Sequence, residues 1–270
     1  MRFCILGPIQ LVDGTGSAVN LPQKVSQLLA LLLLRTGQVV ELSQLVDELW
    51  EEAPPPGAEL TTRKYAYELR RALLRSGVDA ALETRAPGYL LRADPSDIDA
   101  VQFERLHWRV REHLLGGEPK QAAQLCQQAL AMWRGHPMAD VTAGPLLRGH
   151  AARLAEVRTF LLQDRITAAL ELGCHREALS ELRRLVEVYP LDEWFHAQLI
   201  YALDLCGRRA DALEAYQRVR RLLDDDLGVE PSVELQRLQH DVLTGARRRP
   251  FRIVPEREVP VLFRPALLAS

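Results

Sequence analysis

The chain has 270 residues, of which 47% are hydrophobic and 26% charged, with 34 Lys and Arg against 36 Asp and Glu. This composition is typical of a folded protein of one large or two modest domains, and it excludes an intrinsically disordered chain. The longest apolar run, residues 28–34, is far shorter than the roughly 20 residues of a membrane-spanning helix, and the N-terminus lacks a signal-peptide core. We therefore expect a cytoplasmic protein with no membrane partner.

Residues that catalysis or metal binding would need do not form any known motif. The four cysteines, at positions 4, 126, 174 and 206, lie far apart and form no Cys-x-x-Cys pair, which argues against a zinc site or a disulfide framework. No phosphate-binding loop, dinucleotide-binding glycine motif, zinc-protease motif or serine nucleophile elbow occurs. The sequence therefore predicts a protein that is not an enzyme, with no catalytic residues, no metal and no cofactor.

The N-terminal part begins with short apolar runs separated by turn formers. This pattern, over residues 2–20, predicts two or three short antiparallel strands. Residues 23–35 are mostly apolar, follow Pro22 and stop before Gly37, which predicts a helix. Ser43 then precedes the string QLVDELW, and we expect its hydroxyl to cap a second, short helix.

A third helix is predicted over residues 60–74, LTTRKYAYELRRALL, after the proline-rich linker at 53–59. At 100° per residue, one side of this helix is apolar or small and the other is cationic. The first side holds Thr62, Tyr65, Ala66, Leu69, Ala72 and Leu73, and the second holds Arg63, Lys64, Tyr67, Arg70 and Arg71. Charged helix faces are usually only solvated, but a tyrosine among cations is typical of a surface that contacts nucleic acid.

A strand, a tight turn at Pro87-Gly88 and a second strand are predicted over residues 81–93. The order sheet, three helices and hairpin predicts a winged helix-turn-helix, whose third helix enters the DNA major groove while the hairpin reaches the backbone. Residues 61–92 hold seven cations and three acids, a net charge of +4. The acids lie mainly elsewhere in this half, so a mildly acidic total charge does not preclude DNA binding.

From residue 99 onward the pattern is helical, and it repeats. Residues 172–185 and 206–219 align with a spacing of 34, the tetratricopeptide period, and a weaker copy lies at 115–130. We therefore predict a mainly α fold, in which an all-α tetratricopeptide-like helical-repeat domain follows a winged helix with small β-sheets and a wing hairpin. The predicted domains are residues 1–95, residues 96–245 and a flexible tail at 246–270.

The strings ELSQLVDELWEEAPPPGAELTTRKYAYELRRALL and LETRAPGYLL resemble the OmpR-type winged helix of the SARP family, the antibiotic-pathway activators of actinobacteria. The shared features are the DELW string, the Tyr-x-x-x-Leu-Arg-Arg-x-Leu pattern from Tyr65 to Leu73, and Gly88-Tyr89 in the wing. The helical half matches the bacterial transcriptional activation domain of that family, so the resemblance covers about residues 1–245. Two positions differ, because Glu68 stands where many relatives carry a cation and Tyr67 replaces a small polar residue, which affects the base preference.

The resemblance implies which residues touch DNA. Arg63, Lys64 and Tyr67 are expected at base edges and Arg70 and Arg71 near phosphates, with Gly88 and Tyr89 shaping the wing. The complete expected set of DNA-binding residues is Lys24, Ser43, Thr61, Arg63, Lys64, Tyr67, Arg70, Arg71 and Arg85.

The resemblance also implies a function. It indicates a sequence-specific transcriptional activator of secondary-metabolite genes that binds direct repeats of double-stranded promoter DNA near the −35 element as a homodimer. It further implies contacts with the sigma factor and other RNA polymerase subunits, in the bacterial cytoplasm and at the nucleoid. An alternative is a helical-repeat adaptor or ligand-binding protein whose winged helix is a protein-interaction surface. Alanine at Arg63, Lys64 and Arg70 separates the two, since only an activator would lose promoter binding.

Overall fold

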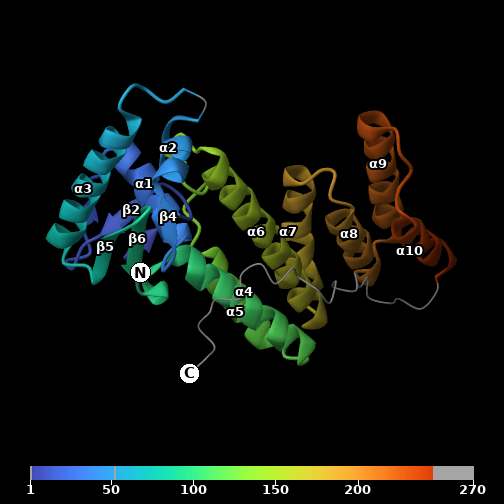
Figure 1. Ribbon diagram of the computed structural model, residues 1–270. Helices are drawn as coiled ribbons and strands as arrows, with labels where there is room; N and C mark the ends of the chain where they lie inside the picture. Colours follow the sequence, from blue (N-terminus) through green and yellow to red (C-terminus); the bar gives the residue numbers. More distant parts are fainter. Residues whose placement is uncertain (1, 52, 246–270) are drawn as a thin grey trace. The chain divides into compact units, whose positions relative to one another are not determined.

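The structure is a computed structural model that describes residues 2–51 and 53–245. The chain divides between Leu172 and Gly173 into two compact units, whose elements are labelled in Figure 1. The fold is mainly α, with small antiparallel sheets only near the N-terminus of the described residues, which confirms the predicted fold class. The predicted tail at 246–270 lies outside the described residues.

The first unit begins with a three-stranded antiparallel sheet of β1 (Phe3–Cys4), β2 (Gln10–Val12) and β3 (Ala18–Val19), in chain order. Phe3 lies opposite Leu11, and Leu11 lies opposite Val19. Phe3 and Leu11 are fully buried because alternate side chains of each strand point into the core. The short strands predicted for residues 2–20 are confirmed.

Three helices follow, α1 (Gln23–Leu34), α2 (Leu42–Trp50) and α3 (Ala58–Ser76). Nine consecutive residues of α1 are buried, so the apolar run at 28–34 forms a central core helix surrounded by other elements. The prediction that Ser43 caps α2 is wrong. The helix begins at Leu42, two residues before the predicted start at Gln44, and its cap is Glu41. The Glu41 side chain accepts from the backbone N–H of Gln44, and the Gln44 side chain accepts from the backbone N–H of Glu41.

The second sheet forms the wing and has the order β4-β6-β5, with β4 (Val39–Glu41), β5 (Ala80–Arg85) and β6 (Gly88–Ala93). The sequence does not predict strand β4, because three residues between two helices are too few to show an alternation of apolar and polar side chains. Gly88 already belongs to β6, and a Cβ atom there would lie 1.8 Å from the backbone oxygen of Val40. Only glycine at position 88 therefore permits β4 to pair with β6 at this register. The neighbouring Tyr89 is buried, as expected for a residue that shapes the wing.

The remaining elements of the first unit are the short helix η1 (Pro95–Asp97) and helices α4 (Asp99–Leu115), α5 (Pro119–Leu130) and α6 (Pro145–Glu171). A single hydrophobic core extends from Phe3 through the winged helix to Ala168 in α6. The domain boundary predicted between residues 95 and 96 stays a prediction. Residues before and after that boundary contribute to the same hydrophobic core.

Two buried carboxylates link the winged helix to the helices that follow it. Asp99, 2% exposed, accepts hydrogen bonds from the backbone N–H groups of Ile5 at 2.8 and 2.9 Å and of Leu6 at 3.0 Å. Glu48 in α2, also 2% exposed, accepts from the N–H groups of Leu146 at 2.8 Å and Leu147 at 3.2 Å, at the start of α6. Both acids therefore satisfy backbone donors that would otherwise be buried without a partner.

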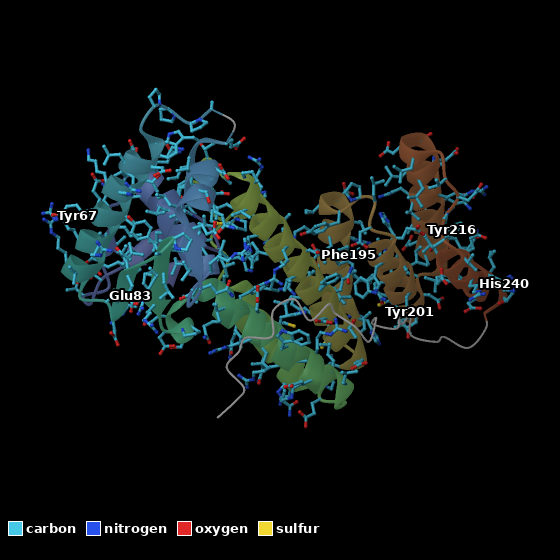
Figure 2. The ribbon with its side chains drawn as sticks, in the orientation of Figure 1. Tyr67, Glu83, Phe195, Tyr201, Tyr216 and His240 are labelled. Atoms are coloured by element: carbon cyan, nitrogen blue, oxygen red, sulfur yellow. The ribbon has the colours of Figure 1, made fainter. Side chains whose placement is uncertain are left out.

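The second unit contains the two helix pairs of the sequence repeat, α7 (His175–Val188) with α8 (Glu193–Leu205) and α9 (Arg209–Leu227) with α10 (Val233–Thr244). Gly173 and Gly207 occupy equivalent places before α7 and α9, and both have a φ of +75°, a conformation that favours glycine. Helix α8 is buried along ten of its thirteen residues. The ring centroid of Phe195, a residue labelled in Figure 2, lies 5.4 Å from the ring centroids of both Tyr189 and Trp194.

His196 belongs to the buried part of α8. Its side chain is 6% exposed and its Nε2 atom lies 2.8 Å from the carbonyl oxygen of Pro190. Burial lowers the pKa of His196 and outweighs the bond to Pro190 and the carboxylates of Asp192, Glu193 and Glu187, which raise it. The folded environment therefore favours the neutral form of the imidazole.

We expect acid to destabilise the second unit in part through His196. Because the folded-state pKa lies below the unfolded value of about 6.5, the unfolded chain binds the proton more readily, and stability falls as the pH drops below that value. His196→Gln should therefore lose less stability than the wild type between about pH 7 and pH 5 in urea unfolding followed by circular dichroism. His240→Gln, at an exposed position of α10, is the control. Equal pH slopes for the wild type and His196→Gln would contradict the expectation.

Candidate nucleic-acid interface

Helix α3 has two clearly different faces. The buried residues are Ala58, Thr62, Ala66, Leu69, Leu73 and Ser76, and they recur at helical spacing. Tyr65 is half-buried and stacks on Trp50 of α2, with ring centroids 6.2 Å apart. The packing side predicted from the sequence is thus the side that faces the core, and the opposite side is exposed along one edge of the first unit in Figure 1.

The exposed face of α3 carries cations around an aromatic ring. The side chains of Arg63 and Lys64 are 55% and 72% exposed. Tyr67 is 55% exposed and points outward from the helix in Figure 2. The guanidinium carbon of Arg71 lies 5.8 Å from the centroid of the Tyr67 ring, a distance at which a cation and a ring attract each other. The face therefore offers both hydrogen-bond donors and a flat apolar surface to a ligand.

Arg70 and Thr61, two residues of the expected DNA-binding set, donate hydrogen bonds to backbone carbonyl oxygens. The Nε atom of Arg70 donates to the carbonyl oxygen of Leu82 at 3.0 Å, and its Nη2 atom donates to the hydroxyl of Thr84 at 3.1 Å. Arg70 thereby fastens α3 to strand β5. The hydroxyl of Thr61 donates to the carbonyl oxygen of Gly57 at 3.3 Å, within the first turn of α3. Contacts of Arg70 and Thr61 with DNA stay predictions.

Lys24 and Ser43 lie at the beginnings of α1 and α2. The ammonium group of Lys24 donates to the carbonyl oxygen of Leu49 and lies 6.0 Å from the centroid of the Trp50 ring, so it holds α1 to the end of α2. Ser43 is exposed, and its hydroxyl lies 3.4 Å from a carboxylate oxygen of Glu41. Their roles in DNA binding also stay predictions.

The wing presents two exposed arginines joined by one acid. Arg85 and Arg92 have side chains that are 58% and 60% exposed. Their Nε atoms lie 2.9 Å and 2.6 Å from the two carboxylate oxygens of Glu83. The hydrogen bonds from Arg92 and then from Arg85 lower the pKa of Glu83 below its usual value, so this carboxylate is ionised at neutral pH.

Arg92 and Glu83 were missed as site residues by the sequence analysis. The signal was available in part, because Glu83 and Arg85 are two apart in a predicted strand and therefore share a face. Two acids on α3 also pair with cations of the expected DNA-binding set, which the sequence does not reveal. Glu59 lies 3.2 Å from Arg63, and Glu68 lies 4.0 Å from Lys64. Exposed pairs of this kind are worth only about 0.2–1 kcal/mol each, so phosphate groups can displace them.

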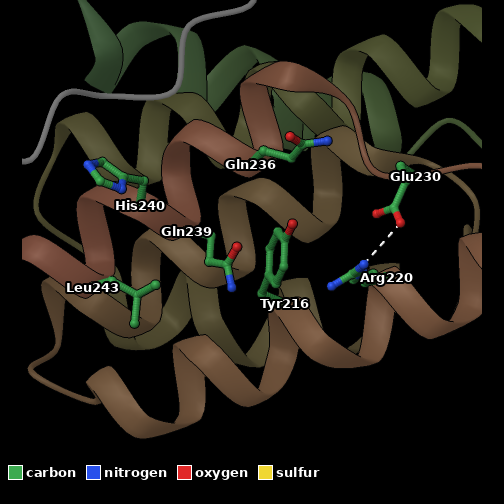
Figure 3. A pocket seen from close by; sticks show the side chains of 7 residues that line it. All are labelled: Tyr216, Arg220, Glu230, Gln236, Gln239, His240 and Leu243. Carbon is green, nitrogen blue, oxygen red and sulfur yellow. Dashed lines mark hydrogen bonds and ion pairs between the residues drawn. The ribbon is translucent and has the colours of Figure 1, made fainter.

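The second unit contains a polar groove between α9 and α10, of about 500 Å³. It is lined by Tyr216, Arg220, Glu230, Gln236, Gln239, His240 and Leu243. Figure 3 shows the Arg220–Glu230 ion pair, with an N–O distance of 2.9 Å, on one side of the Tyr216 ring and Gln239 on the other. The lining suits hydrogen bonding more than apolar binding.

The described residues offer neither a metal-binding cluster nor a membrane-spanning helix. Within residues 2–51 and 53–245, no three His, Cys, Asp or Glu side chains are grouped so as to hold a metal ion. None of the helices in that part of the chain combines the length and the apolarity needed to cross a bilayer.

Known proteins match both halves of the chain. Residues 16–91 match the family described as transcriptional regulatory protein, C terminal, and residues 98–243 match the bacterial transcriptional activator domain. The chain is 37% identical over 250 residues to the regulatory protein DnrI of Streptomyces peucetius, and the match covers 90% of this chain and 92% of DnrI. The chain belongs to the SARP family. Members of the SARP family are DNA-binding transcriptional activators and not enzymes.

Other SARP-like relatives are longer than this chain. The regulatory protein AfsR of Streptomyces griseus is 37% identical over 243 residues, which cover 90% of this chain but 24% of AfsR. The structure of Mycobacterium tuberculosis EmbR in complex with a low-affinity phosphopeptide is similar, with a TM-score of 0.85 and 30% sequence identity. That similarity covers 90% of this chain and 65% of the EmbR chain. The predicted order of a winged helix followed by a helical activation domain is therefore confirmed.

Proposed function

We propose that this SARP protein activates secondary-metabolite (antibiotic) biosynthesis genes by inserting α3 into the major groove of promoter DNA. The observation that carries the proposal is the exposed face of α3, on which Arg63, Lys64 and Arg71 surround Tyr67. Arginine and lysine donate to guanine edges and to phosphates, and the tyrosine ring packs on apolar parts of bases or sugars. The opposite side of α3 is buried in the core, which fixes the direction in which these groups point.

The remaining predicted residues have supporting places in this arrangement. Arg85 on the wing reaches the adjacent phosphate backbone or minor groove. Thr61 and Ser43 lie in the first turns of α3 and α2, where backbone N–H groups favour phosphate. Arg70 and Lys24 act mainly by holding α3 to the wing and α1 to α2, since their cationic groups are bonded to backbone oxygens.

The proposal extends to the assembly on the promoter. Two protomers bind direct repeats beside the −35 element head to tail, as a homodimer on DNA, and the helical domain recruits RNA polymerase through the sigma factor and other subunits. The protein then acts in the bacterial cytoplasm, associated with the nucleoid. Support comes from the match of residues 98–243 to the bacterial transcriptional activator domain.

The test measures binding of the purified protein to promoter fragments from its own gene neighbourhood. Binding is measured by fluorescence anisotropy at several salt concentrations. We expect tight binding that scrambled DNA does not match, with log K falling linearly as log salt rises between about 50 mM and 200 mM. The slope reports the number of phosphates that are neutralised. Equal binding of promoter and scrambled DNA would reject α3 as a reader of sequence.

The alternative is an adaptor or ligand-binding protein, and the groove between α9 and α10 is the observation that favours it. In that case the winged helix is a protein-interaction surface. Alanine at Tyr216 and Gln239 would then abolish the effect of the protein on gene expression in cells, whereas substitutions on α3 would leave promoter binding unchanged. An activator that reads DNA through α3 gives the reverse result for the α3 substitutions.

A further inference from the structure

Acids accompany most of the cations on the proposed DNA-binding surface. The pairs, with their N–O distances, are Glu59–Arg63 at 3.2 Å, Glu68–Lys64 at 4.0 Å, Glu83–Arg85 at 2.9 Å and Glu83–Arg92 at 2.6 Å. A surface that only attracted phosphate would be better without these acids, because each removes positive charge where DNA must bind. Their presence calls for a physical explanation.

Glu83 differs from the other two acids in its geometry. It is bonded to two arginines, and its side chain is 28% exposed, against 66% for Glu59 and 37% for Glu68. Glu83 is anchored in β5, Arg85 lies two residues further along the same strand, and Arg92 projects from β6 at a position diagonal to Glu83. All three side chains therefore lie on the same face of the sheet.

The carboxylate binds each arginine by only part of its guanidinium group. Arg85 uses its Nε and Nη2 atoms toward Oε2 of Glu83, and Arg92 uses its Nε atom toward Oε1. A guanidinium group has five N–H donors, so each arginine keeps donors for a second acceptor. An arginine held in this way has lost much of its rotamer freedom before any ligand arrives, which removes part of the cost of binding.

We propose that Glu83 is a positioning residue that presents Arg85 and Arg92 to DNA as a fixed pair, and that this pair contributes to sequence selection. This inference rests on the proposed DNA-binding function, and it adds Arg92 to the residues that contact DNA. At the correct site, the fixed arginines meet the phosphate backbone or minor groove at the spacing that the wing sets. At any other site the Glu83 carboxylate repels phosphates that do not match this spacing.

The test compares Glu83→Gln with the wild type on the selected promoter fragment and on scrambled DNA. We expect the ratio of the two affinities to fall by about 5- to 50-fold, because the arginines become mobile and lose their preorganisation. Scrambled DNA should bind more tightly, with a salt slope steeper by about one phosphate equivalent. Glu230→Gln is the matched control, because Glu230 is also an exposed acid paired with an arginine, at 2.9 Å, and its removal changes the net charge equally.

Glu83→Asp separates position from charge. The shorter side chain keeps the negative charge but does not reach both arginines, so we expect weaker promoter binding with unchanged binding to scrambled DNA. In an Arg85→Ala, Arg92→Ala background, Glu83→Gln should leave the affinity ratio unchanged, since its partners are absent. A wing that is merely misfolded would lower both affinities in every variant.

The outcomes that overturn the inference are distinct from failure of the proposed function. If Glu83→Gln strengthens promoter and scrambled binding by the same factor, Glu83 acts only through its charge and the positioning role is wrong. If Glu83→Gln and Glu230→Gln behave alike, the effect belongs to net charge. If the wild type itself does not distinguish promoter from scrambled DNA, the proposed function fails before Glu83 is tested.

Discussion

We expect Asp99→Ala to lower the free energy of unfolding by about 3–5 kcal/mol, which is a large part of the stability of an ordinary domain. The Asp99 carboxylate is 2% exposed and accepts hydrogen bonds from the backbone N–H groups of Ile5, Leu6 and Ala100. Alanine would leave these donors buried without acceptors. Burial raises the pKa of Asp99, so the site already opposes the carboxylate charge and tolerates it because of these bonds.

The measurement is urea unfolding followed by circular dichroism, with hydrogen exchange to locate the effect. Because Asp99 connects the first strand region to α4 and one core covers both, amides of α3 and of α4 should lose protection together. Asp97→Ala is the control, an acid two residues away in η1 that is not buried. A change below about 0.5 kcal/mol in Asp99→Ala, or loss of protection in α4 alone, would contradict the expectation.

The second large effect is expected from Arg63→Ala, Lys64→Ala and Arg71→Ala combined. These side chains project from the exposed face of α3, and we expect promoter affinity to fall by about 100-fold or more, at about 1–3 kcal/mol for each base-edge contact. The salt slope should become shallower because fewer phosphates are neutralised. Alanine favours helix, so α3 itself should persist, and thermal unfolding checks this.

The matched control removes three exposed cations from the second unit, Arg218→Ala, Arg221→Ala and Arg237→Ala. It changes the net charge by the same amount and should reduce affinity only slightly through the long-range field. Similar losses in the two triple variants would mean that charge, and not the face of α3, controls binding. Arg70 is left out of both sets because its bonds to Leu82 and Thr84 make its loss a structural change.

Local patterns in the sequence are enough to predict much of this fold. The helical spacing of Thr62, Ala66, Leu69 and Leu73 predicts α3 and the side that it buries, because periodicity within one helix depends only on that helix. The repeat of 34 residues predicts the helix pairs around Gly173 and Gly207 for the same reason. The prediction of the α2 cap was wrong. Glu41, the actual cap, is also the last residue of β4, and β4 forms only because it pairs with β6, a segment distant in the sequence.

The partners of the charged residues required the tertiary structure. The resemblance predicts that Arg70 lies near a phosphate, and that contact stays a prediction. The sequence does not show that strand β5 brings the oxygens of Leu82 and Thr84 to Arg70. Lys24 is bonded to α2 in the same way. Residue type and helical position predict that a cation is exposed or buried on its own helix, and they do not predict which acceptor another element supplies.

The longest-range contacts were hidden from any local pattern. Asp99 binds Ile5, which is 94 positions away, and Glu48 binds Leu146 and Leu147, 98 and 99 positions away. An acid at the start of a helix or within an amphipathic helix normally faces water, so nothing in its neighbourhood distinguishes these two. Composition and periodicity decided the elements and the cationic face of α3, whereas packing between distant segments decided which charges are buried, bonded or free to meet DNA.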